Sequence, residues 1–172
     1  MKVLITGVAG FVGSHILEYL TSFDHECSGV DNFSRSYRER LKDLRIDNLY
    51  DCSLRAFTKS NLNLYFDLII HCSAIAPLPD NEEDPVLSYE TNITDTISIA
   101  EYATKIGCRN LIFLSSGAVY ENDLVFPSTE DRILNTSLVY PTTKLLAESA
   151  LASYSKSYSL NSISLRLFNM YG

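Results

Sequence analysis

The chain has 172 residues, of which 46% are apolar and 20% are charged. This length suits one domain with a sizeable core, and the composition excludes an intrinsically disordered chain. A formal net charge of −7 argues against a nucleic-acid partner, which normally requires a basic patch. No run approaches the ~20 apolar residues of a membrane span, and the N-terminus does not resemble a signal peptide, so we expect a cytoplasmic protein without a membrane partner.

Short runs rich in Val, Ile and Leu alternate with longer segments of helical periodicity, which is typical of βαβ units. In chain order we expect strand Lys2–Thr6, helix Phe11–Ser22, strand Glu26–Val30, a short helix around Tyr37–Asp43, a weaker strand near Asp47–Tyr50, helix Leu54–Lys59, strand Leu68–Cys72, a long helix Pro85–Ile106, strand Asn110–Ser115, helix Pro141–Tyr158 and strand Ser162–Phe168. The longest irregular stretch, Glu121–Val139, is expected to lie over a functional site. This alternation predicts an α/β fold with a doubly wound parallel sheet in the strand order 3-2-1-4-5-6.

A glycine-rich turn joins the first strand to the first helix, with Gly7, Gly10 and Gly13 spaced as G-x-x-G-x-x-G. Glycine permits a tight turn and lets backbone N–H groups and the helix N-terminus face a pyrophosphate. We therefore predict that these glycines, with Phe11 and Val12 between them, bind a dinucleotide. The alternative is a glycine-rich turn with no ligand, since this motif alone is not specific.

An acidic residue, Asp31, ends the second strand close to the ~20 residues after the glycine turn at which an acid binds the adenosine ribose. A carboxylate there accepts hydrogen bonds from a ribose diol and repels the 2′-phosphate of NADP. Asp31, with Asn32 beside it, therefore favours NAD as the cofactor. Arg35 is the dissenting feature because it could reach a phosphate, and a solvated acid at a strand end is the alternative interpretation of Asp31.

Tyr140 and Lys144 lie four residues apart at the start of a helix, so both side chains share one face, and Pro141 suits a first helical turn. A tyrosine has an ordinary pKa near 10, but an ammonium group and a cationic nicotinamide nearby favour its phenolate. This pair is a candidate acid/base and cofactor-binding unit. By itself the spacing is a common accident; its place after the strand that ends in Ser115 favours a functional role.

Six segments, in this order and at these intervals, carry a resemblance that spans the whole chain: TGVAGFVGSH, VDNFS, HCSAIAPLP, SSGAVY, YPTTKLLAE and LRLFNMYG. They resemble the extended short-chain dehydrogenase/reductase family, especially its NAD-dependent sugar epimerase/dehydratase branch, which has a Rossmann fold. The resemblance implies a catalytic triad of Ser116, Tyr140 and Lys144, with Ser116 also touching the sugar. It further implies that Asp51 and Cys52 lie at the adenine and that Asn169 contacts the nucleotide-sugar.

The implied activity is that of an NAD-dependent nucleotide-sugar epimerase or a related oxidoreductase, which acts by transient hydride transfer at a sugar carbon. Dehydration is disfavoured because Gly117 and Ala118 stand where dehydratases of the family carry an Asp-Glu pair. Family members continue into a C-terminal substrate domain, so we expect residues 1–172 to form the NAD-binding domain alone, without turnover. The alternative function is a non-catalytic NAD-binding module or redox sensor.

Two further expectations concern metals and partners. The cysteines and histidines lack ligand spacing, so no metal site is expected. The helices Pro85–Ile106 and Pro141–Tyr158 carry more apolar residues than one sheet-facing stripe requires, which predicts a homodimer through a four-helix bundle. The alternative is that a further C-terminal segment covers this second face, or that it is exposed.

Overall fold

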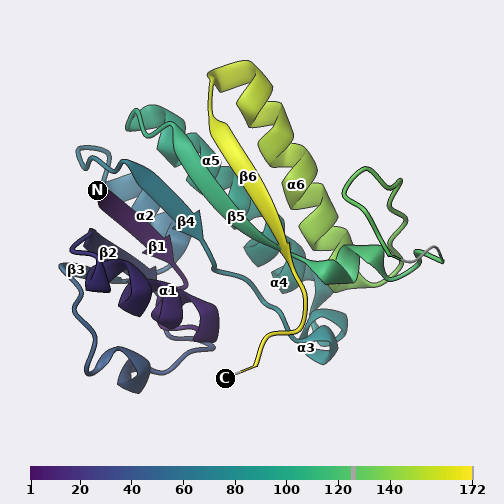
Figure 1. The fold of residues 1–172 in the computed structure, drawn as a ribbon, viewed down its shortest axis with the longest axis horizontal. Helices are drawn as coiled ribbons and strands as arrows, with labels where there is room; N and C mark the ends of the chain where they lie inside the picture. The colour runs from purple at the N-terminus through teal and green to yellow at the C-terminus, as the bar shows by residue number, and fades with distance from the viewer. Residues whose placement is uncertain (125–126, 172) are drawn as a thin grey trace.

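A six-stranded parallel sheet with helices on both faces forms the structure, a computed structural model that describes residues 1–124 and 127–171 (Figure 1). The strands are β1 (Lys2–Thr6), β2 (Glu26–Asp31), β3 (Asn48–Asp51), β4 (Leu68–His71), β5 (Asn110–Ser116) and β6 (Asn161–Leu167). Their order is β3-β2-β1-β4-β5-β6. The predicted doubly wound sheet and its strand order are confirmed, and the switch point lies between β1 and β4.

The helices follow the predicted alternation, with some additions. They are α1 (Phe11–Ser22), α2 (Leu54–Ser60), α3 (Leu78–Glu83), α4 (Pro85–Tyr89), α5 (Asp95–Lys105) and α6 (Val139–Tyr158), together with the short segments η1 (Arg38–Leu41), η2 (Glu90–Thr94) and η3 (Gly117–Tyr120). Because η2 is a π-helical stretch, the long helix predicted over Pro85–Ile106 is one helical run in three parts.

The sequence reading missed α3, which occupies part of the connection between β4 and the long helix. Its first turn contains Pro79, and proline is tolerated there because those N–H groups have no partner inside the helix. The helix ends at Glu83. Its C-cap, Asp84, has non-helical backbone angles (φ −131°, ψ 80°) before Pro85, and the Asp84 side chain caps the next helix by accepting from Leu87 N at 3.0 Å. The segment that contains Pro79 and Pro85 is thus a helix start followed by a stop.

Two expected segments differ from the structure. The helix around Tyr37–Asp43 is only the 3₁₀ turn η1, and of its residues only Leu41 is buried. The stretch Glu121–Val139 is irregular as far as Leu138, while Val139 already belongs to α6; positions 125 and 126 of this stretch lie outside the described residues.

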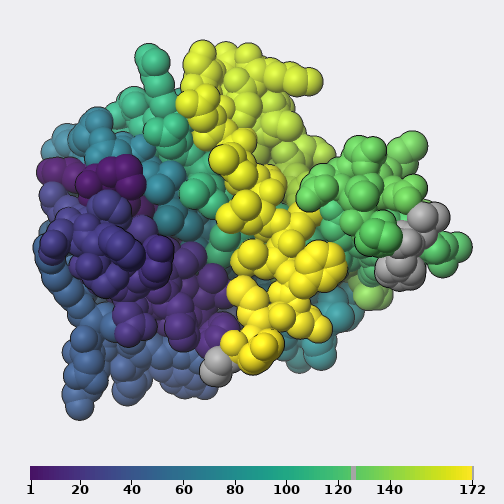
Figure 2. Space-filling model, viewed as in Figure 1, coloured from purple at the N-terminus to yellow at the C-terminus, as the bar shows by residue number. Residues whose placement is uncertain are grey.

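Two apolar clusters hold the layers together, one on each face of the sheet. On one face α1 packs through Leu17 against strand residues such as Ile5 and Ile70. On the other face α2, α5 and α6 pack through residues that include Phe57, Ile99 and Leu151. Figure 2 shows β6 and the residues after it at the surface of the molecule, where Ile163 and Phe168 are exposed. Buried apolar residues therefore cover both faces of the sheet around β1 and β4, beside the switch point.

Candidate functional site

A groove runs across the carboxyl ends of the strands at the switch point. It consists of three adjoining cavities of about 540, 570 and 680 Å³, all of which are lined by Cys72 and Ala74 just after β4. The first reaches toward β2 and β3, the second toward β5 and α6, and the third along the start of α1. Ligands of open α/β sheets bind at such a crevice.

The glycine turn forms the floor of this groove, and its backbone leaves no room for side chains. Gly7 has a φ of +65°, and a Cβ on it would lie 2.8 Å from the Ser73 backbone. A Cβ on Gly13 would lie 2.2 Å from the Gly7 carbonyl oxygen. The twelve-residue helix α1 begins here, with Gly10 as its N-cap and no side chain capping its N-terminus. Open N–H groups at a helix N-terminus suit a pyrophosphate, so these residues fit a dinucleotide.

Asp31 is buried at the end of β2, and its carboxylate holds the surrounding loops. Its Oδ2 accepts from Ala9 N at 2.9 Å, and its Oδ1 accepts from Phe33 N and Ser36 Oγ, both at 2.8 Å. The same acid lines the first cavity beside Asn32. Each carboxylate oxygen has more than one lone pair, so Asp31 can brace the glycine turn and still accept from a ribose hydroxyl.

The two residues expected at the adenine are separated by the structure. Cys52 lines the first cavity, whereas Asp51 is not among its lining residues. The Asp51 carboxylate, half-exposed, instead pairs with the Arg38 guanidinium. Of the two expected adenine contacts, Cys52 is thus the one that lines the cavity beside Asp31.

The second cavity brings the predicted catalytic residues together: Ser116, Tyr140, Lys144 and Asn169 all line it, as do Phe11 and Val12 from the glycine turn. Ser116 ends β5, and Tyr140 and Lys144 lie in the first turns of α6. The Lys144 Nζ donates to the Leu114 carbonyl at 2.9 Å, and burial lowers the pKa of this lysine to about 8. One end of the groove therefore carries a hydroxyl, a phenol and a desolvated ammonium group.

The pKa of Tyr140 differs in direction from the sequence-based expectation. Burial raises the pKa of Tyr140, and its hydrogen bond with Ser116 opposes that rise. The Lys144 Nζ lies 5.8 Å from the centroid of the Tyr140 ring and is not among the causes of the shift. The protein groups alone therefore do not favour the phenolate.

A buried amide network, which sequence reasoning missed, connects the groove to α6. The Asn92 Oδ1 in η2 accepts from Ile75 N at 2.8 Å, while its Nδ2 donates to Ile75 O and to Thr143 Oγ1, both at 3.0 Å. Asn81 also donates to Ile75 O, at 3.1 Å. Since Thr143 precedes Lys144, one asparagine fixes both the loop after β4 and the start of α6. A single polar residue in an otherwise helical pattern carries no signal of this kind.

A second missed network lies one helical turn beyond Lys144. Glu148 accepts from Arg166 of β6 through two bonds, at 2.8 and 3.1 Å, and also from the Ser115 hydroxyl. The Arg166 Nη1 in turn donates to Tyr120 OH at 2.6 Å. These contacts join β5, β6, η3 and α6 beside the predicted catalytic residues, and such a bidentate pair fixes geometry as well as charge.

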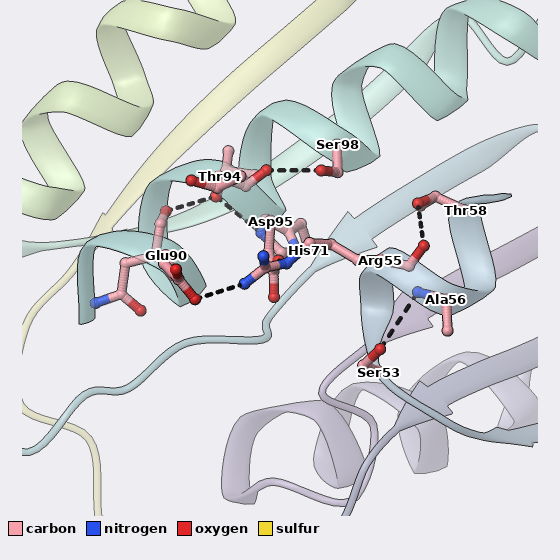
Figure 3. Close-up of polar contacts among 11 residues, drawn as sticks. Ser53, Arg55, Ala56, Thr58, His71, Glu90, Thr94, Asp95 and Ser98 are labelled. Atoms are coloured by element: carbon pink, nitrogen blue, oxygen red, sulfur yellow. Dashed lines mark hydrogen bonds and ion pairs between the residues drawn. The ribbon is translucent and has the colours of Figure 1, made fainter. Parts of the chain in front are cut away.

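A third set of polar contacts involves Asp95, which also lines the first cavity (Figure 3). The Arg55 side chain extends from α2 to the helical run, where it pairs with Glu90 at 3.2 Å and Asp95 at 2.8 Å. His71 at the end of β4 bonds Thr6 Oγ1 at 2.6 Å and Thr96 Oγ1 at 2.9 Å, and burial lowers its pKa to about 3. This histidine is a neutral structural link between β1, β4 and α5.

The structure also bears on the expectations about metal binding and membrane spans. Within residues 1–124 and 127–171, no three His, Cys, Asp or Glu side chains are grouped so that they could hold a metal ion. In the same part of the chain, no helix is both long and apolar enough to cross a membrane.

Comparison with known proteins identifies the family of this chain. The family model described as the NAD dependent epimerase/dehydratase family matches residues 3–172. UDP-glucose 4-epimerase 2 of Arabidopsis thaliana is 32% identical over 183 residues, which cover 99% of this chain and 52% of that protein. Protein CapI of Staphylococcus aureus is 33% identical over 184 residues, 100% of this chain and 55% of that protein. The chain thus spans about half the length of these relatives.

Solved structures agree with this assignment. The UDP-glucose 4-epimerase of Thermotoga maritima with UDP-glucose has a TM-score of 0.90 and 29% identity, covering 96% of this chain and 55% of its own. The UDP-glucose 4-epimerase of Brucella ovis in complex with NAD has a TM-score of 0.90 and 29% identity, covering 98% of this chain and 52% of its own. The resemblance seen in the sequence motifs is confirmed. The chain belongs to the NAD-dependent epimerase/dehydratase family, and its cofactor is NAD.

Proposed function

We propose that the chain is the NAD-binding domain, residues 1–172, of a nucleotide-sugar epimerase whose substrate domain lies outside it. The observation that carries this proposal is the meeting of Ser116, Tyr140, Lys144 and Asn169 in one cavity that adjoins the cofactor groove. A module that only bound NAD would have no need of the serine and the tyrosine. A non-catalytic NAD-binding module or redox sensor remains the second candidate, on the ground that fold alone does not establish turnover.

In this proposal bound NAD would supply the redox chemistry, as the hydride acceptor when a sugar carbon is oxidised and as the hydride donor when that carbon is reduced again. Tyr140 removes the proton of the sugar hydroxyl as that carbon is oxidised and gives it back when the carbon is reduced. Ser116 donates a hydrogen bond to the reacting oxygen, and Lys144 binds the nicotinamide ribose. Asn169 contacts the nucleotide-sugar, while Asp31, Asn32, Asp51 and Cys52 hold the adenosine end.

Epimerisation is favoured over dehydration by the residues that follow Ser116. Gly117 and Ala118 have no side chain that could add or remove a proton, whereas elimination of water from a sugar needs an acid and a base of its own. Return of a hydride to the opposite face of the same carbon would need no acid or base other than Tyr140.

The decisive experiment replaces Tyr140 by Phe in a form of the protein that includes a substrate domain. We expect turnover of UDP-sugars to fall by about 10²–10⁴-fold, the usual contribution of a general acid/base, with NAD affinity within about twofold. Tyr154→Phe on the same helix is the matched control and should leave both unchanged. Near-normal turnover of Tyr140→Phe would contradict the catalytic role and favour the second candidate.

For residues 1–172 alone we expect NAD binding without turnover, because hydride transfer requires a sugar held in near-attack geometry. Calorimetry with NAD and product analysis with UDP-sugars measure the two properties separately. Robust turnover would show that the whole substrate site lies within these residues. A cytoplasmic location also stays a prediction; the free thiols of Cys27 and Cys108, both buried, are consistent with a reducing compartment.

The homodimer is a further part of this proposal, with a narrower surface than the sequence predicts. Ile99, Ala100, Tyr102 and Ala103 of α5 are buried in the chain's own core, so they cannot face a partner. The apolar residues left exposed on these helices include Val86, Leu87 and Leu146. Two copies of this surface, related by a twofold axis, would form an isologous interface.

Light scattering on Leu146→Glu tests the homodimer. We expect a dimer for the unmodified chain and a monomer for the variant, since a buried unpaired carboxylate opposes association. Leu62→Glu, which charges another exposed leucine in the loop before β4, should remain a dimer. An unmodified chain that scatters as a monomer would contradict the proposal.

A further inference from the structure

Two arginines in the loop after β2 are each paired with an acid from another element. The Arg35 guanidinium pairs with Asp80 of α3, and the Arg38 guanidinium pairs with Asp51 of β3 and lies 3.9 Å from the centroid of the Phe33 ring. The loop that follows Asp31 therefore carries positive charge, but each of these guanidinium groups is already paired with a carboxylate.

Arg35 matters because of the cavities that it lines. It lines the first cavity together with Asp31, Ser34 and Ser36, and it lines the third cavity together with Asp80. A guanidinium in this position has the geometry to bind a phosphate through two bonds. The 2′-phosphate of NADP, carried on the ribose that we place beside Asp31, is the anion that would meet it.

We propose that Asp80 is a specificity-determining residue that favours NAD over NADP by holding Arg35 on the α3 side of the groove. With the ion pair formed, the loop presents the Asp31 carboxylate to the adenosine ribose, while the cation that could neutralise a 2′-phosphate is already neutralised. Asp80 also adds negative charge to the third cavity, as Asp31 does to the first. The inference rests on the proposed place of the ribose beside Asp31.

The size of the effect follows from the exposure of the pair. The side chains of Arg35 and Asp80 are 43% and 34% exposed, so solvent screens their attraction. Exposed pairs contribute little energy, and breaking this one changes an affinity by about fivefold rather than by orders of magnitude. Asp31 supplies the larger part of the preference, and we expect the unmodified chain to bind NAD at least about tenfold more tightly than NADP.

Calorimetric titration of NAD and NADP into Asp80→Asn tests the proposal. We expect the affinity for NADP to rise about fivefold while the affinity for NAD stays within about twofold of the unmodified chain. The double variant Asp80→Asn/Arg35→Gln should lose the gain, because the freed guanidinium is what binds the phosphate. Glu83→Gln removes the same charge from the same helix without touching Arg35, and it should leave the ratio of affinities unchanged.

The outcomes separate the role of Asp80 from that of Asp31. If the tenfold preference for NAD is unchanged in Asp80→Asn, the role of Asp80 is overturned and that of Asp31 stands. Equal affinities for NAD and NADP in the unmodified chain overturn both assignments. A gain in NADP affinity that persists in the double variant also overturns the proposal, since another cation such as Arg40, which lines the third cavity, would then bind the phosphate.

Discussion

The two ends of the groove are built by different means. At the end formed by β1, α1 and β2, backbone groups dominate: glycines leave room, N–H groups face the groove, and Asp31 braces the turn through Ala9 N. At the end formed by β5, α6 and β6, buried side chains dominate, with Lys144 and the Glu148–Arg166 pair fixed among several elements. A phosphate needs many N–H groups at close range, whereas a sugar hydroxyl needs one phenol held in one place. The first end should therefore be sensitive to side-chain atoms added at its glycines. The second should be sensitive to the loss of a hydrogen-bonding or ionic partner.

The largest effect on stability is expected at the catalytic end, from Glu148→Ala. This change leaves the Arg166 guanidinium, with only 18% of its side chain exposed, without its carboxylate. Removal of one partner from a buried pair costs about 3–5 kcal/mol, so about 2–3 kcal/mol is expected for a pair that retains some exposure. Urea unfolding measures it. Glu101→Ala, which breaks the exposed pair with Lys105, should cost less than about 0.5 kcal/mol, and equal costs would contradict the distinction.

At the cofactor end, Gly13→Ala should cost about 2 kcal/mol of unfolding free energy and at least about tenfold in NAD affinity. The added Cβ would lie 2.2 Å from the Gly7 carbonyl oxygen, so the turn itself must shift. Gly10→Ala is the graded control, because its Cβ would lie 3.1 Å from the same oxygen and can be relieved by a small movement. Thermal unfolding and calorimetry measure the two quantities, and equal effects of the two variants would show that close packing is not the cause.

The smallest effect depends on pH and concerns His71, which lies between the two ends. Its pKa in the folded chain is about 3, below the ordinary 6.5, so the unfolded chain binds more protons between these values. Stability is therefore complete above about pH 6.5 and falls as the pH drops, by at most about 1.4 kcal/mol per unit. Unfolding in urea at pH 7 and pH 5.5 should differ by about 1 kcal/mol.

Two variants assign this pH dependence. His71→Gln should remove most of the difference between pH 7 and pH 5.5, because the titrating group is gone. His15→Gln, at an exposed position on α1, should preserve it. A His71→Gln chain that loses stability over this range as the unmodified chain does would assign the pH dependence to other groups.

Much of the architecture could be predicted from local patterns. The alternation of apolar runs with helical periodicity predicted all six strands to within about a residue or two at each end, and the parallel order followed from the βαβ pattern. The short helix α3 was not predicted, and the prolines at its start and just after its end are compatible with a loop as well as with a helix. The extent of the second apolar face on the long helix was overestimated, since periodicity cannot tell which residues the chain's own core will cover.

The amino-acid sequence by itself determined which groups reach the groove. Glycines, Asp31, Ser116, Tyr140 and Lys144 follow strand ends or begin helices, and in a parallel sheet all carboxyl ends of the strands meet at one edge. Only the tertiary structure decided how those groups are held and charged. The partners of Asn92, Glu148 and Arg35 come from elements far away in sequence, and burial, which sets the pKa of Lys144 and Tyr140, exists only once the layers have packed.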